Sequence, residues 1–434
     1  MTPNPSNCMT PSAKLIATLL LFAFVIGCAE DDDPPAPTGG GGGGGTGTAQ
    51  YNWAGCPVDQ RPIWFAYQDG DGDWTPMTSS SGQYSFTISA DKGGVAYVLR
   101  DSEGRETTNI EYKSAAALNG GYQACPSAGT TRTAFGTANG LSSNDDEEWF
   151  DQGRMHLGPA AVGLAFAGES SFVLTGSWNG PEDLFAYRSR FSFGGTPPAH
   201  STDRCIIRRN QNPANGATLP MFDFNGTEAF TAATSTLTIT GGTPQQIDMT
   251  YIASGDCLLK DGASVLYSDI DVSGTNVIAG IPAARQLPGE LHCLSIHGSN
   301  VDWIALRLFA TMGPQTVQVP SMAAPTVAPL PAGYARFQAN YTVPSTMYAA
   351  PYGNTLFAYE QTNGNKVSVF TSFELLDAQT VSSVPPELEG LEGWDPAWWP
   401  LDGQPGTWKL SVQSIDFDCH EEGTSFTLMK NGTY

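Results

Sequence analysis

Charged residues are scarce in this chain of 434 residues, because Asp, Glu, Lys and Arg together make up 15% of it, against an average of about 25% in soluble proteins. Basic residues are the scarcest, since 20 Lys and Arg stand against 43 Asp and Glu, for a formal net charge of −23. A surface of that sign repels polyanions. We therefore expect no nucleic-acid partner.

Sequence motifs for catalysis and metal binding are also missing. The chain has no G-x-S-x-G elbow, no Walker A loop, no Rossmann fingerprint, no H-E-x-x-H and no C-x-x-C pair. We therefore predict a protein that is not an enzyme and holds no cofactor, apart from the calcium considered below. The alternative is a glycan hydrolase, because its two carboxylates can lie far apart in the sequence without forming a local motif.

Long apolar runs are missing beyond the N-terminus, and no later segment repeats apolar residues at helical spacing. The one long run, LIATLLLFAFVIG at 15–27, follows Lys14 and is shorter than the ~20 residues that a membrane-spanning helix needs. It has the length of the apolar core of a signal peptide. We predict that 1–27 is a signal peptide, with an N-terminal anchor as the alternative.

The four residues VIGC, at 25–28, resemble the lipobox of bacterial lipoproteins. The resemblance implies cleavage before Cys28, lipidation of its thiol, and attachment of the chain to a membrane through lipid rather than a spanning helix. The family pattern permits passage to the outer membrane when the next residue is not Asp, and here it is Ala29. The sequence leaves open whether the protein faces the periplasm or the cell surface.

Residues 28–50 begin with this cysteine and an acidic, proline-containing run, and continue through seven consecutive glycines. Such a composition cannot bury a core, so we predict a flexible tether. Together with the β domains predicted next, the lipobox and the acidic, glycine-rich tether resemble the layout of uncharacterised surface lipoproteins. That resemblance implies location and architecture but no activity.

From residue 51 onward, short runs rich in aromatic and β-branched residues alternate with turns. In YSFTIS, Tyr84, Phe86 and Ile88 fall on one face of a strand and polar residues fall on the other. Such spacing predicts an all-β protein built of tandem antiparallel, Ig-like β-sandwich domains. The predicted β domains are 51–128, 129–200, 201–320 and 321–434, with one short helix in SAAALNGG.

Six cysteines remain after the predicted cleavage and lipidation, and an even number in an oxidising compartment predicts three disulfides. Cys56 and Cys125 bracket one compact segment, so we expect them to pair. The sequence leaves open the pairing of the other four, which are Cys205, Cys257, Cys293 and Cys419.

The stretch QDGDGDW, between two predicted strands, is a candidate calcium site. Counting Asp69 as position 1 of an EF-hand loop places Asp71 and Asp73 at positions 3 and 5, where ligands belong. Trp74 then replaces the required glycine at position 6, and Ser80 replaces the bidentate acid at position 12. The alternative is a hairpin turn, in which Gly supplies positive φ and Asp caps the turn.

Tryptophans give two candidate glycan-binding surfaces, because indole faces complement the C–H faces of sugar rings. The first is Trp74, in a strand–loop–strand stretch whose GDW-x-P-M phrase resembles the front half of starch-binding-type carbohydrate modules. By that resemblance, Trp74 stacks on sugar. The second is the cluster Trp394, Trp398, Trp399 and Trp408. Burial in a sandwich core is the alternative for both.

These observations predict a lipid-anchored lipoprotein of the envelope or cell surface, with a non-catalytic binding or structural role. A glycan is the expected ligand if the tryptophans are exposed. A glycan hydrolase and a purely structural spacer are the alternatives. The oligomeric state stays open.

Overall fold

The computed structural model describes most of the chain after residue 46. The described residues are 47–125, 131–144, 149–158, 161–178, 180–192, 199–252, 264–267, 275–298, 302–331, 334–361, 364–417 and 421–434. The predicted signal peptide, Cys28 and most of the tether lie outside these ranges. Within them, no helix has the length and apolar composition needed to span a membrane.

Strands make up nearly all the secondary structure of the described residues, so the predicted all-β, sandwich-type fold is confirmed. The α-helices there are α2 (Ala115–Asn119) and α3 (Ser345–Tyr348). Helix α2 lies in the segment predicted as helical, and the Ser114 hydroxyl caps it by accepting from the Ala117 N–H. Short 3-10 helices are η2 (Val58–Gln60), η3 (Ala283–Arg285), η5 (Phe373–Leu375) and η6 (Pro396–Trp398).

The first sandwich packs a small sheet against one end of a large sheet. The small sheet runs β4-β1-β7, with β1 (Gly47–Asn52), β4 (Gln83–Ile88) and β7 (Tyr122–Gln123). It faces β2 (Trp64–Asp69), β3 (Trp74–Met77), β5 (Lys92–Arg100) and β6 (Glu106–Ser114). Aromatic rings fill the space between the sheets, and Phe65 stacks on Tyr84 with ring centroids 4.2 Å apart. The predicted alternation in β4 is confirmed, since Tyr84, Phe86 and Ile88 are buried.

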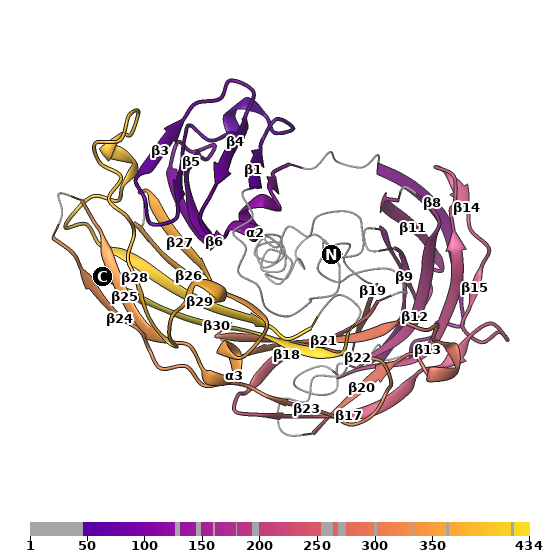
Figure 1. Ribbon diagram of the computed structural model, residues 1–434. Coiled ribbons are helices and arrows are strands. Elements are labelled where there is room, and N and C mark those ends of the chain that lie inside the picture. The colour runs from indigo at the N-terminus through magenta and orange to yellow at the C-terminus, as the bar shows by residue number, and fades with distance from the viewer. Residues whose placement is uncertain are drawn as a thin grey trace, which may run out of the picture.

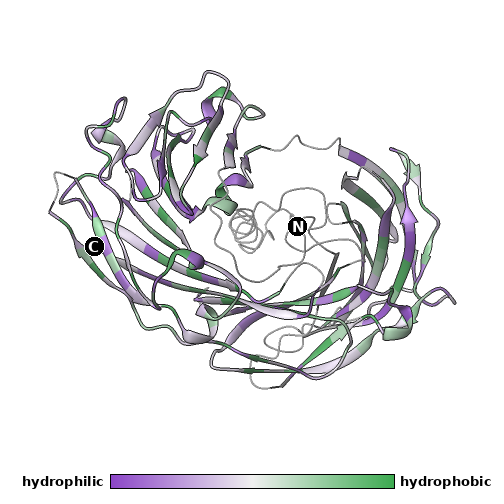
Figure 2. Cartoon of the chain, in the orientation of Figure 1, coloured by the Kyte–Doolittle hydropathy of each residue, from purple (hydrophilic) through white to green (hydrophobic). Residues whose placement is uncertain are grey.

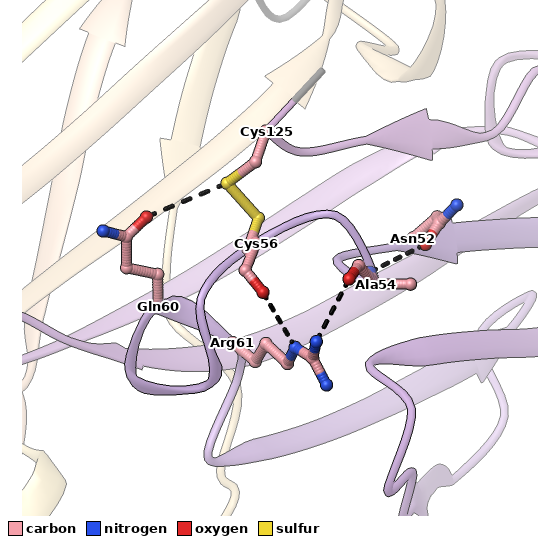
Figure 3. Close-up of a disulfide and its surroundings, with 6 residues drawn as sticks. All are labelled: Asn52, Ala54, Cys56, Gln60, Arg61 and Cys125. Carbon is pink, nitrogen blue, oxygen red and sulfur yellow. Dashed lines mark hydrogen bonds between the residues drawn. A yellow bond between two sulfur atoms is a disulfide. The ribbon is translucent and has the colours of Figure 1, made fainter. Parts of the chain in front are cut away.

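The predicted disulfide between Cys56 and Cys125 is confirmed in this sandwich. Beside it, the Arg61 guanidinium donates to the carbonyl oxygens of Cys56, at 3.2 Å, and Ala54, at 3.0 Å (Figure 3). The disulfide therefore ties the turn after β1 to the chain after β7.

The prediction of three disulfides is wrong, because two of the remaining cysteines are unpaired. Cys205 and Cys293 are unpaired thiols, and both are buried. Each points into an apolar cluster, because alternation along β13 (Ala199–Gln211) and β21 (Leu291–Gly298) turns these positions away from solvent. Burial raises the pKa of both thiols, that of Cys293 to about 12. Cys257 and Cys419 lie outside the described residues.

The large sheet has twelve strands in the order β19-β18-β21-β22-β30-β29-β26-β27-β6-β5-β2-β3. Its further strands are β18 (Pro244–Ile252), β19 (Ser264–Tyr267), β21 (Leu291–Gly298), β22 (Trp303–Phe309), β26 (Tyr352–Gln361), β27 (Lys366–Ser372), β29 (Gly406–Ile415) and β30 (Gly423–Thr433). It takes strands from three of the predicted domains, through the parallel pair β27–β6 and the antiparallel pair β22–β30. The domain boundaries themselves stay predictions.

Two three-stranded sheets cover the outer face of the large sheet. One is β20-β17-β23 and the other β24-β25-β28. Their strands are β17 (Ala233–Thr240), β20 (Thr275–Gly280), β23 (Gln315–Gln318), β24 (Thr326–Pro329), β25 (Phe337–Thr342) and β28 (Thr380–Ser383). Leu237, Phe337 and Tyr341 from these sheets pack with Ile247, Leu294 and Phe357 of the large sheet in one continuous core.

A separate nine-stranded sheet forms the other arm of the protein. Eight of its strands lie in the order β14-β8-β11-β10-β9-β12-β13-β16, and β15 also pairs with β8. Its strands are β8 (Thr131–Asn139), β9 (Trp149–Leu157), β10 (Ala161–Phe166), β11 (Ser171–Ser177), β12 (Glu182–Ser192), β13 (Ala199–Gln211), β14 (Ala217–Thr218), β15 (Phe222–Asp223) and β16 (Phe230–Thr231). Phe222 and Phe224 cover its core beside Met155 and Leu174.

The two large sheets form an open arc, with the three-stranded sheets β20-β17-β23 and β24-β25-β28 on its outside (Figure 1). Apolar and polar residues alternate along many strands (Figure 2). In β29, Leu410 and Val412 point outward into the core, whereas Ser411 and Gln413 point to the opposite side and are half-buried. We call that opposite side of the twelve-stranded sheet the inner face. It is the side on which the β4-β1-β7 sheet packs at one end.

Candidate functional site

Polar side chains line up across the inner face of the twelve-stranded sheet. On seven neighbouring strands, the register brings together Gln246, His297, Ile304, Thr427, Gln413, Asn354 and Ser372. All seven are half-buried, and six of them are polar. We call this set the polar row. Neighbouring strands lie about 4.8 Å apart, so the row is about 29 Å long.

Hydrogen bonds orient the polar groups in and beside this row. Asn354 Nδ2 donates to Gln413 Oε1 at 3.3 Å, and Gln246 Nε2 donates to Asp248 Oδ2 at 2.6 Å. His297 Nε2 lies 2.9 Å from the Ser295 hydroxyl. Burial lowers the pKa of His297, so its imidazole is neutral at neutral pH. The row therefore offers amide, hydroxyl and imidazole groups without a formal charge.

The structure brings three of the predicted tryptophans together, but as part of a core. Trp394 lies 5.1 Å from Trp398 and 5.4 Å from Trp399, measured between ring centroids. Trp398 and Trp399 are buried, at the short helix η6. Trp64 of β2 contacts the same cluster, and its indole N–H donates to the carbonyl of Glu392 at 3.2 Å. These rings pack the 388–400 segment against the first sandwich. Because Trp398 and Trp399 are buried there, they offer no exposed stacking surface.

The two other predicted tryptophans, Trp74 and Trp408, are half-buried and pack against the main core. Trp74 meets Tyr112 edge to face, with ring centroids 6.2 Å apart, and lies 3.0 Å from where a Cβ atom would be at Gly94. Trp408 covers Gly432 in the same way, at 2.4 Å from where a Cβ atom would lie. Each indole is thus in close contact with the backbone of a neighbouring strand.

Asp69 ends β2, and Asp71 and Asp73 lie in the turn between β2 and β3. The Asp69 carboxylate accepts from the N–H groups of Ser89 and Ala90, each at 2.9 Å, and from the Ser89 hydroxyl, whose hydrogen bond lowers its pKa. Asp71 pairs with Lys92 at 2.8 Å. Gly70 has a φ of +61°, as the hairpin alternative expects. Among the described residues, no three His, Cys, Asp or Glu side chains form a group that could hold a metal ion.

Sequence reasoning missed a buried ionic cluster that links the nine-stranded sheet to the twelve-stranded one. Arg209 of β13 pairs with Asp183 of β12 and with Glu290, which immediately precedes β21. The Glu290 side chain is fully buried, and its carboxylate also accepts from the Tyr251 hydroxyl and from the N–H of Leu287. We call these groups the joint cluster. Nothing local in the sequence marks it, because its members come from four distant segments.

A second buried ion pair lies in the first sandwich, and here the sequence carried a signal. Glu111 and Lys113 are two residues apart on β6, so they share one face of the strand, and their side chains pair at 2.8 Å. Glu111 also accepts from the hydroxyls of Tyr51, at 3.1 Å, and Tyr97, at 2.9 Å. Although burial opposes its charge, Lys113 and the two hydroxyls hold the pKa of Glu111 below its usual value.

Acidification is expected to destabilise the protein through His156, which is 4% exposed and stacks on Tyr187. Burial, assisted by Arg154, lowers its pKa from 6.5 to about 4. The unfolded chain therefore takes up the proton first. The free energy of unfolding is therefore at its full value above pH 6.5. It decreases by about 3 kcal/mol as the pH falls toward 4. Urea unfolding at a series of pH values measures this loss.

The variant His156→Phe provides the matched comparison. It keeps a ring against Tyr187, and it removes a buried Nε2 that has no hydrogen-bond partner within the described structure. The variant should lose about 3 kcal/mol less than the wild type between pH 6.5 and pH 4. Equal acid losses in the two proteins would show that His156 is not the responsible group.

Comparisons with known proteins add little to this geometry. No protein-family model matches the chain, and no curated protein matches it. The FN1–FN3 domains of chicken CNTN1 are similar over 70% of this chain and 99% of that chain, at 7% identity and a TM-score of 0.14. The Bacillus anthracis TIE protein is similar over 89% of this chain and 72% of that chain, at 9% identity and a TM-score of 0.14. Similarity at this level carries no inference about function.

Proposed function

We propose that this protein is a lipid-anchored lipoprotein of the outer membrane that binds a glycan along the polar row and performs no chemistry. The lipobox-like VIGC and the acidic, glycine-rich tether support the anchor. From Cys28 to the start of β1 the chain can extend about 60 Å, which lets the β sandwiches stand clear of the membrane. A purely structural role in the envelope is the alternative.

The polar row is the observation that carries the binding proposal. Sugar hydroxyls both donate and accept hydrogen bonds, as do hydroxyl, amide and neutral imidazole groups. The row repeats such groups across a sheet face over about 29 Å, so an extended chain meets one after another. The sheet is formed before the ligand arrives, so binding orders few further groups. The tryptophans of the sequence-based hypothesis are less suited, because two of them are buried.

The anchor is tested by metabolic labelling with a palmitate analogue. The wild-type chain should carry the label and fractionate with the outer membrane, and Cys28→Ser should carry none. Label in Cys28→Ser would contradict the proposal, as would unlabelled wild-type protein that is free in the periplasm.

The binding site is tested with the mature chain in detergent and a panel of soluble polysaccharides, both neutral and acidic, by affinity electrophoresis. Thr427→Trp places a large ring in the middle of the polar row and should weaken binding at least tenfold. The matched control is Thr326→Trp, at an exposed position of β24 on the outer side, which should bind like the wild type.

Three outcomes would count against this function. If no polysaccharide binds, the structural alternative is favoured. If Thr427→Trp binds like the wild type, the polar row is not the site. If the polysaccharide is shortened during the experiment, the hydrolase alternative is favoured, and Asp248 becomes the first carboxyl group to replace, because it lies on the inner face and burial raises its pKa.

A further inference from the structure

An exposed aromatic ring lies beside the polar row on β26, the strand next to the β27 end of the row. Tyr352 is 58% exposed, although it belongs to a strand of the twelve-stranded sheet. It lies two residues before Asn354, so alternation along β26 places both side chains on the inner face. Its register partner is Ile415, whereas that of Asn354 is Gln413, two residues earlier on β29. Tyr352 therefore lies beside the row, on the same strand as Asn354, and offers a flat apolar surface next to the amide pair.

The amide pair of Asn354 and Gln413 leaves half of its hydrogen-bonding capacity for a ligand. One N–H of Asn354 donates to Gln413 Oε1, and Asn354 Oδ1 and Gln413 Nε2 take no part in this hydrogen bond. If both amides are flipped, one amide oxygen and one amide nitrogen are still left over. Adjacent hydroxyls of a sugar ring match this arrangement, because one can donate while its neighbour accepts.

The charges on this part of the inner face do not favour an acidic ligand. The polar row contains no Lys, Arg, Asp or Glu. Asp248 lies beside its far end, and Lys409 lies four residues from Gln413 along β29, about 14 Å away. Two cations lie near the ends of the row, and each is beside a carboxylate: Lys113 pairs with Glu111, and Arg154 acts on Asp248. The whole chain carries a formal charge of −23, so an anionic chain is repelled by the protein.

We propose that Tyr352, Asn354 and Gln413 form the principal sugar-binding subsite, and that the ligand is an uncharged polysaccharide running across the strands along the polar row. The Tyr352 ring stacks on the C–H face of one sugar, and the amide pair bonds two of its hydroxyls. This inference rests on the proposed glycan-binding function and assigns its ligand class and its main contacts.

The experiment measures affinity for the neutral polysaccharide that the wild-type mature chain binds most tightly, and for the same polysaccharide after oxidation of its C6 hydroxyls to carboxylates. Tyr352→Ala and the double variant Asn354→Ala/Gln413→Ala should each weaken binding of the neutral form at least tenfold. Tyr352→Trp keeps an aromatic ring at this position and should bind the neutral form like the wild type. Phe135→Ala is the matched control, because Phe135 is an aromatic residue 44% exposed on the nine-stranded sheet. The oxidised form should bind at least tenfold more weakly than the neutral one.

The outcomes separate this inference from the function on which it rests. If nothing in the panel binds, both fail. If binding is blocked by Thr427→Trp but unchanged in Tyr352→Ala, the row is a glycan site and the subsite is wrong. If the oxidised polysaccharide binds as well as the neutral one, the assignment to uncharged ligands is wrong. Circular dichroism of each variant shows that it has kept the wild-type strand content.

Discussion

Loss of the Cys56–Cys125 disulfide is expected to lower the free energy of unfolding of the first sandwich by about 4 kcal/mol. The bridge joins residues 69 positions apart, and the loop-closure entropy of a loop that long is about 4 kcal/mol at 25 °C. Urea unfolding of Cys56→Ala/Cys125→Ala, monitored by fluorescence, measures the effect.

The control uses the reductant itself. The wild type treated with a phosphine reductant should unfold like the double variant, and the double variant should not respond to reductant. Cys205→Ala should leave the response of the wild type to reductant intact, since Cys205 is unpaired. A wild type whose unfolding midpoint is the same with and without reductant would contradict the prediction.

Replacement of Glu290 by Ala is expected to cost about 4 kcal/mol, because it breaks a buried ion pair from one side. Its carboxylate has no exposure, and it receives hydrogen bonds from the Arg209 guanidinium, the Tyr251 hydroxyl and the Leu287 N–H. The variant leaves these donors without their acceptor. Since the joint cluster links the two large sheets, the loss should appear in the cooperative unfolding of both.

An exposed carboxylate elsewhere in the protein gives the matched control. Glu228 also pairs with an arginine, Arg208, at 2.8 Å, but its side chain is 45% exposed. Glu228→Ala should therefore cost less than about 1 kcal/mol. Equal losses in the two variants would show that the joint cluster carries no special stability, and a loss in Glu290→Ala confined to one sheet would show that it does not link them.

Local features of this protein followed from local sequence. The alternation of YSFTIS places Tyr84, Phe86 and Ile88 in a core because a strand turns every second side chain to the same face. The glycine at position 70 adopts the positive φ that a hairpin needs. Cys56 and Cys125 pair because the segment they bracket folds into one sandwich. In each case, the controlling interactions lie within a single segment.

Features that depend on long-range register could not be read in this way. The parallel pairing of β27 with β6 joins segments about 260 residues apart, and it carries the twelve-stranded sheet across the predicted domain limits. The 388–400 segment packs Trp398 against Trp64 of the first sandwich and stacks Trp399 on Tyr334, and both indoles are buried as a result. Composition indicated only that these indoles were available for stacking, and nothing near them indicated a partner from β2.

The all-β class, the short helix α2, the turn after Asp69 and one disulfide could be predicted from the sequence, because alternation, turn residues and spacing act within a few residues or a single sandwich. The place where the polar residues meet depends on the pairing of distant strands. Gln246, His297, Thr427 and Asn354 look unremarkable in their own strands, and they form a row only because seven strands pair in one register. The physical reason is that each strand offers one such group, while a binding surface needs several side by side.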